Sequence, residues 1–300
     1  MRYLKYSLLL VLSIALLGSA AYVPMAHAQD SGDPLAPADP LAEEPKEKDP
    51  NDPLELRKKE VLTNIKRLEK AVRDYPGDAF LFYELAQAYQ EGMFYQYAKD
   101  TYVEAISRNP ELKEAYVDCA SLEFRTGNQS DAEALLVSAR ERFPEFGPVY
   151  TNLGRIYQEQ GRTNEALAAY AEGFKFSPDD AGASFNYGNL LVASGDYAKA
   201  KDAFQAVLKQ NKDDVEAMIN LGVTLLELED TEGAFETYLA ALAIAPERPE
   251  PYMNLAQLHL RQGDKESAAS MLRIYVSQDS TSSEGIIARA LIRKIEAGSN

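Results

Sequence analysis

The sequence predicts an all-helical solenoid of repeated helix pairs, and a fixed spacing of prolines is the first observation behind this prediction. Pro76, Pro110, Pro144 and Pro178 are 34 residues apart, and Pro246 lies two such intervals after Pro178. A constant period of this length indicates stacked repeats, so fold and function must be read per repeat. A stacked array of helix pairs offers a long surface and no enclosed pocket, which favours binding over catalysis.

Alignment on the prolines gives six units with the same internal pattern. The units are 79–112, 113–146, 147–180, 181–214, 215–248 and 249–282. Position eight is always small (Ala86, Ala120, Gly154, Gly188, Gly222, Ala256), and position twenty is always alanine (Ala98, Ala132, Ala166, Ala200, Ala234, Ala268). Larger apolar residues recur at helical spacing around both positions, which predicts two amphipathic helices per unit that approach closely at the small residues.

The helix ends are also marked in the pattern. Four units carry glycine at position fifteen, where a residue in the left-handed conformation is expected to end the first helix: Gly127, Gly161, Gly195 and Gly263. Met93 and Glu229 replace this glycine in the first and fifth units. The proline at position thirty-two is expected to stop the second helix, because it has no N–H and clashes with the preceding turn.

This pattern resembles the tetratricopeptide repeat family over residues 79–282, in six consecutive units. The resemblance implies a right-handed superhelical solenoid of helix-turn-helix repeats whose first helices line a concave groove. It also implies that the protein binds protein or peptide partners and is not an enzyme. Pentatricopeptide repeats are helical pairs of similar length, but they bind RNA. The negative net charge of this chain does not suit binding to RNA, which is itself negatively charged.

The segments outside the repeats divide the rest of the chain. Residues 1–28 are expected to be a secretory signal, with Arg2 and Lys5 before an apolar run and Ala26-His27-Ala28 as the cleavage site. An uncleaved membrane anchor is the alternative, although the apolar run is short for a full span. Residues 29–53 are expected to be a disordered acidic, proline-rich linker. Helices at 54–77 and within 283–300 are expected to cap the array.

Charge and cysteine content restrict the partners and the compartment. The chain has a net charge of −16, and removal of residues 1–28 leaves 29 basic and 47 acidic residues, a net charge of −18. This negative charge argues against nucleic acid as a binding partner and against direct binding to a membrane after signal cleavage. Cys119 is the only cysteine, so no internal disulfide is possible. An exported protein that has this type of signal and no disulfide is expected in the periplasm of a Gram-negative bacterium.

No residue pattern for catalysis or cofactor binding stands out. The chain beyond residue 28 contains one histidine, His259, and it has no Cys/His cluster and no glycine-rich phosphate loop. We therefore expect no catalytic residues, no metal and no cofactor. Cys119 occupies an apolar position of its unit and is expected to be a core residue.

The candidate peptide-binding groove comes from the first helices. Position six carries asparagine in four successive units (Asn152, Asn186, Asn220 and Asn254), here called the asparagine ladder. An amide both donates and accepts hydrogen bonds, so such a ladder is suited to the backbone of an extended peptide, although it is equally suited to helix packing. The remaining candidate groove residues are Tyr83, Arg155, Phe185, Asn189, Ile219 and Met253.

Two functions from different classes remain open. The first is a periplasmic adaptor that binds peptide segments or partner subunits in the groove. The second is a self-associating structural scaffold within a cell-envelope or polysaccharide-export assembly, which makes a homo-oligomer possible. An accessory domain with undetected enzymatic activity is a third and weaker interpretation.

Overall fold

The computed structural model of this chain describes residues 53–298, which form fourteen helices and no strands. The predicted all-helical repeat solenoid is confirmed. The expected signal at 1–28 and all but the last residue of the expected linker at 29–53 lie outside the described residues. The chain divides into two compact units at residue 63, within the first helix, and all that follows concerns the second unit, from Asn64 onward.

Two helices fall within each of the six repeats. α1 (Pro53–Asp74) precedes them and α14 (Ser283–Ala297) follows them. The first helices of the repeats are α2 (Ala79–Glu91), α4 (Lys113–Arg125), α6 (Gly147–Glu159), α8 (Ala181–Ser194), α10 (Val215–Glu227) and α12 (Pro249–Arg261). The second helices are α3 (Tyr95–Arg108), α5 (Gln129–Arg142), α7 (Thr163–Phe176), α9 (Tyr197–Gln210), α11 (Thr231–Ile244) and α13 (Lys265–Gln278).

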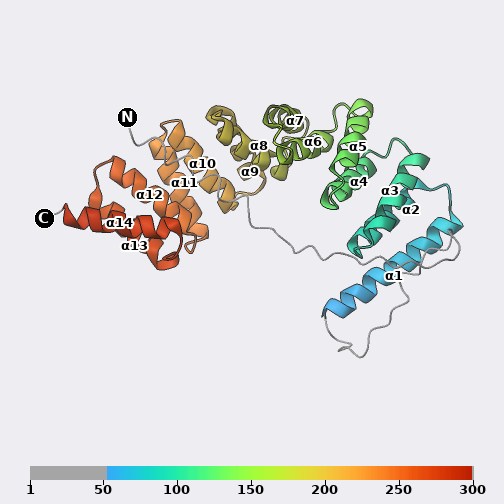
Figure 1. Cartoon of the computed structure of the whole chain (residues 1–300), viewed down its shortest axis with the longest axis horizontal. Coiled ribbons are helices and arrows are strands. Elements are labelled where there is room, and N and C mark those ends of the chain that lie inside the picture. The colour runs from blue at the N-terminus through green and yellow to red at the C-terminus, as the bar shows by residue number, and fades with distance from the viewer. Residues whose placement is uncertain (1–52, 299–300) are drawn as a thin grey trace. The chain divides into compact units, whose positions relative to one another are not determined.

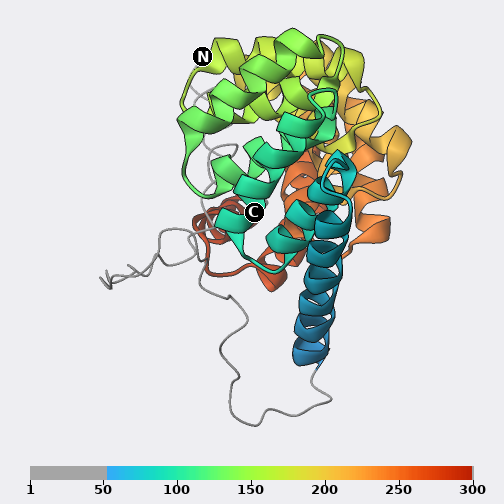
Figure 2. The same cartoon turned by 90° about the vertical axis from the view of Figure 1, so that its right-hand side faces the viewer.

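Neighbouring helices pack in chain order. The two helices of each repeat lie side by side, and each second helix also contacts the first helix of the next repeat (Figure 1). Figure 2 shows the same helices in a perpendicular view. First helices of neighbouring repeats touch as well, for example α4 with α6 and α8 with α10. Among the described residues, each repeat thus packs mainly against the repeats that precede and follow it in the chain.

Close contact between the helices of a pair depends on the small residue at position eight. A Cβ atom placed on Gly154 would lie 2.8 Å from the Tyr170 ring, and one placed on Gly222 would lie 2.5 Å from the Tyr238 ring. The large side chain at position twenty-four is completely covered in this arrangement, with an exposed fraction of 1% for Tyr170 and 0% for Tyr238. Each ring thus lies directly against the backbone of the facing helix.

Position fifteen adopts the left-handed conformation in every repeat, whether or not it is glycine. Gly127, Gly161, Gly195 and Gly263 have φ between 72° and 91°. Met93 and Glu229 occupy the same position with φ of 64° and 63°. Gly92, one residue before Met93, has φ of −74° and does not replace the missing glycine. The repeat geometry therefore imposes a conformation that costs a residue with a Cβ atom about 1–2 kcal/mol.

We predict that two glycine substitutions within the first helices have opposite effects on the free energy of unfolding. Gly222→Ala forces the Tyr238 ring from its place and is expected to destabilise the fold by about 1–3 kcal/mol. Gly182→Ala meets only Asp180 Oδ1, at 3.5 Å, and is expected to stabilise its helix by about 0.5–1 kcal/mol. Urea unfolding monitored by circular dichroism measures both effects. Equal effects of the two changes would contradict this description of the packing.

A second prediction concerns the left-handed positions. Glu229→Gly removes the steric conflict at φ 63° and is expected to raise the free energy of unfolding by about 1 kcal/mol. Gly161→Ala is the matched control, because its added Cβ has no neighbour within 4 Å and introduces the backbone conflict alone. It is expected to lower the free energy of unfolding by a similar amount. Thermal melting of both variants tests the pair.

Candidate functional site

The asparagine ladder lies on a surface that we call the ladder face. It consists of the side chains at positions five, six, nine and twelve of the first helices, from α2 to α12. All four ladder asparagines are half-buried, so each has part of its surface in contact with solvent. Among all residues at these positions, only Glu84, Asp118 and Arg155 are charged. From the fourth repeat onward the ladder face is uncharged and consists of amide and apolar side chains.

Hydrogen bonds between repeats follow a simple rule on this face. A side chain at position nine of one repeat bonds the side chain at position six of the next repeat. Ser121 Oγ donates to Asn152 Oδ1 over 3.0 Å, and Asn189 Oδ1 accepts from Asn220 Nδ2 over 2.9 Å. Asn152 also donates through Nδ2 to the Pro148 carbonyl at 2.8 Å. Asn152 and Asn220 therefore hold neighbouring first helices together.

Asn186 and Asn254 are the exceptions to this rule. Within residues 53–298, neither side-chain amide makes a hydrogen bond to the protein. The residue at position nine of the preceding repeat explains both cases. Arg155 precedes Asn186, and its guanidinium instead lies 5.2 Å from the centroid of the Phe124 ring. Val223 precedes Asn254 and has no polar atom on its side chain. These two amides keep a donor and an acceptor for a ligand.

The structure corrects two of the apolar groove candidates. Ile219 and Met253 are each only 6% exposed, so they offer almost no surface to a ligand. Met253 packs into a cluster with Ala256, Leu272, Tyr275 and Ala288, and Ile219 packs with Met218 and Ala241. Position five is covered here by neighbouring helices, which the spacing within a single repeat does not reveal. Phe185 is half-buried, with its ring edge-on against Phe204 at a centroid distance of 5.9 Å.

Another polar group links the first two repeats at the start of the ladder face. Tyr83 donates its hydroxyl to Asp118 Oδ2 at 2.7 Å, and Gln87 Nε2 donates to the same oxygen at 3.3 Å. Burial and the hydrogen bond to the Asp118 carboxylate raise the pKa of Tyr83 well above its usual range. Tyr83 was a predicted groove residue, and its hydroxyl is occupied by Asp118. The Gln87–Asp118 bond follows the same nine-to-six rule.

A shallow cavity of about 300 Å³ adjoins this group. Its walls are Asn64, Arg67 and Leu68 of α1, together with Glu84 and further residues of α2. Arg67 donates to Asn64 Oδ1 at 2.9 Å and places a positive charge opposite the carboxylates of α2. Positive and negative groups thus face each other, so the cavity has no single charge preference.

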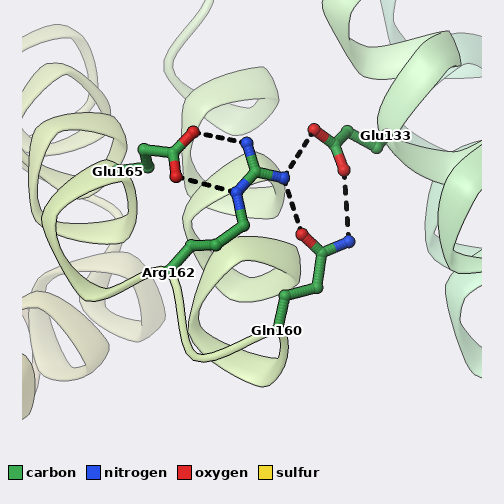
Figure 3. Close-up of polar contacts among 4 residues, drawn as sticks. All are labelled: Glu133, Gln160, Arg162 and Glu165. Carbon is green, nitrogen blue, oxygen red and sulfur yellow. Dashed lines mark hydrogen bonds and ion pairs between the residues drawn. The ribbon is translucent and has the colours of Figure 1, made fainter.

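A separate polar cluster joins α5 of the second repeat to the turn between α6 and α7 of the third repeat. Arg162, at the start of α7, donates through Nη1 to Glu133 Oε1 of α5 at 2.8 Å and through Nε to Glu165 Oε2 at 2.8 Å (Figure 3). Gln160 completes the ring by accepting from Arg162 and donating to Glu133. Arg162 lowers the pKa of Glu165 by this hydrogen bonding. Each of the four side chains is hydrogen-bonded to another member of the cluster, which indicates a structural contact between repeats.

The described residues include no group of three or more His, Cys, Asp or Glu side chains that could hold a metal ion. Cys119 is 1% exposed, and burial raises the pKa of its thiol to about 12, so the thiol stays protonated at neutral pH. A buried neutral thiol is a poor nucleophile. None of the helices in this part of the chain has the length and apolar character needed to cross a membrane.

Comparison with known proteins agrees with this geometry. Models of the tetratricopeptide repeat match residues 151–200, 188–249 and 225–292.

Three solved structures illustrate the similarity. YrrB, described as a tetratricopeptide repeat protein with an unusual peptide-binding site, is 19% identical, with a TM-score of 0.59 over 63% of this chain and 97% of its own. PilF of Pseudomonas aeruginosa is 18% identical, with a TM-score of 0.57 over 71% and 97%. The C-terminal part of a repeat protein from Cytophaga hutchinsonii is 16% identical, with a TM-score of 0.60 over 78% and 96%.

These matches support the tetratricopeptide repeat family, with the sequence models covering the third to sixth repeats. At such low identity the structural neighbours establish the fold alone. A comparison with curated protein sequences finds no match. Tetratricopeptide repeat proteins generally mediate interactions between proteins and are typically not enzymes.

Proposed function

We propose that this protein is an exported adaptor that binds an extended segment of a partner protein on the ladder face. The observation that carries the proposal is that Asn186 and Asn254 keep unpartnered amides on a face where the other ladder amides are bonded between repeats. A peptide backbone presents a carbonyl and an N–H at each residue, and a side-chain amide matches both. Such contacts recognise main chain, so they suit partners of varied sequence.

Apolar neighbours add to the binding surface around these amides. Phe185, Val192 and Val223 are half-buried and keep part of their surface exposed. An extended segment that buries this surface gains about 25 cal/mol for each Å² of apolar area removed from water. Amide and apolar side chains recur along successive first helices, which is consistent with a long segment in preference to a small molecule.

The scaffold interpretation also has an observation in its favour. Ile286 and Ile287 of α14 are 57% and 54% exposed, an unusual placement for two adjacent isoleucines. A second copy or another subunit that packs on α14 would cover them. Measurement of mass against concentration separates the two functions, because an adaptor of the proposed kind stays monomeric while it binds peptides.

The export part of the proposal rests on the sequence of residues 1–28 and gives one prediction. The mature protein is expected to begin at Gln29, after the Ala26-His27-Ala28 site. N-terminal sequencing of protein released from the periplasm by osmotic shock measures this directly. An intact Met1 in protein from the membrane fraction would instead identify an uncleaved anchor.

The binding part gives a second prediction. Binders are first selected with the wild-type protein from a displayed library of random twelve-residue segments. The double variant Asn186→Ala, Asn254→Ala is then expected to bind the selected peptides about tenfold more weakly or worse, because each amide contact contributes roughly 0.5–1.5 kcal/mol. Its thermal stability is expected to stay close to wild type, since neither amide bonds the protein and alanine favours helix.

The matched control is the double variant Asn152→Ala, Asn220→Ala. These amides bond Ser121 and Asn189 between repeats, so their loss is expected to lower the melting temperature and to change peptide affinity far less. Isothermal titration calorimetry and thermal melting measure the two effects separately. If both double variants bind with wild-type affinity, or if the library yields no binder, the ladder face is not the binding site.

A further inference from the structure

We infer that Asp118 is a specificity-determining residue of the ladder face and selects a lysine or arginine side chain at one end of the bound segment. The inference rests on the proposed function and adds the chemistry of the partner to it. Asp118 occupies position six of the second repeat, in register with the four ladder asparagines. Aspartate has the shape of asparagine, so the ladder continues into the second repeat with a carboxylate in place of an amide.

This replacement changes what the position recognises. An asparagine amide donates and accepts, whereas an ionised carboxylate only accepts and carries a negative charge. A segment that meets uncharged amides at the third to sixth repeats therefore meets a charged acceptor at the second. A cationic side chain satisfies that acceptor best, because hydrogen bonds between ionised groups are about twice as strong as neutral ones.

The geometry holds the Asp118 carboxylate in a fixed orientation. Tyr83 and Gln87 both donate to Oδ2, at 2.7 Å and 3.3 Å, and these two donors come from the preceding repeat. Oδ1 has no hydrogen-bond partner among residues 53–298 and remains available to a ligand. The carboxylate thus resembles the Asn186 amide in keeping an unused polar atom on the ladder face, and it adds a charge.

The surroundings of Asp118 strengthen the preference for a cation. Glu84 at position six of the first repeat and Glu114 of α4 are both exposed, and neither is in an ion pair with a described residue. The nearest positive group along the ladder columns is Arg155 at position nine of the third repeat, which stacks on Phe124. Arg67 of α1 lines the cavity beside Glu84, whereas Asp118 is in no ion pair with any residue from 53 to 298, so the charge of the Asp118 carboxylate is left unpaired.

Asp118→Asn tests this inference because it removes the charge and keeps the shape. Asparagine still accepts from Tyr83, so the melting temperature is expected to stay close to wild type. The displayed library of random twelve-residue segments is selected in parallel on the wild type and on the variant. Wild-type binders are expected to be enriched in lysine and arginine near one end, and this enrichment is expected to disappear with Asp118→Asn.

Affinity measurements on one selected peptide complete the test. Asp118→Asn is expected to weaken binding about three- to tenfold, and substitution of the peptide's basic residues by glutamine should weaken wild-type binding by the same factor. Added salt should reduce this difference between wild type and variant. Glu141→Gln is the matched control, since it removes an equal charge from an exposed position in the last turn of α5 and should leave affinity unchanged.

The outcomes separate this inference from the proposed function. A wild-type protein that selects binders without basic enrichment, or an Asp118→Asn variant that binds the basic peptide as tightly as wild type, overturns the inference and leaves the adaptor function standing. An equal loss of affinity with Glu141→Gln also overturns it, because the effect would then come from overall charge. A wild-type protein that selects no binder removes the proposed function and the inference together.

Discussion

The packing of a large side chain against a residue with little or no side chain is the constraint on which the rest of this structure depends. Gly154, Gly188 and Gly222 each lie against an aromatic ring of the second helix of their repeat. The contact fixes the distance between the two helices, and it leaves no room for even one carbon atom to be added. Position eight is alanine in the other three repeats, so all six repeats pair a small residue with a large one. The first helices are therefore presented at regular intervals, and side chains at the same position form a continuous face.

The polar contacts between repeats described above join neighbouring repeats, which follows from this stacking. The bonds that join first helices connect residues 31 to 35 positions apart, as in Tyr83–Asp118 and Ser121–Asn152. The Arg162–Glu133 pair and the Arg248–Glu216 pair span 29 and 32 positions. Each repeat from residue 79 to 282 is thus held mainly by its neighbours, and stability is approximately a sum of local terms. A change in one ladder amide is accordingly expected to affect one interface and not the whole array.

The sequence predicts the helix pairs well, because small, large and left-handed positions recur in each repeat and satisfy local physical requirements. Even the exceptions Met93 and Glu229 take the predicted conformation at position fifteen. The ladder face is less predictable, because its contacts involve two repeats. Ile219 and Met253 look exposed within their own helices and are buried by neighbouring ones. A signal for the engaged amides was present in the sequence, in the residue at position nine of the preceding repeat, but it is visible only when neighbouring repeats are compared.

The candidate function therefore arises where the repeat departs from its own pattern. If every position nine carried a polar residue such as Ser121 or Asn189, every ladder amide would be bonded within the array, and the face would be stable and unreactive toward ligands. With Arg155 and Val223 at position nine these two bonds are missing, and the side-chain amides of Asn186 and Asn254 make no hydrogen bond to the described residues. Asp118 departs in a second way, since it is bonded through one oxygen and keeps the other. The same positions that hold the repeats together thus provide, where bonding is incomplete, the polar atoms that a partner segment can use.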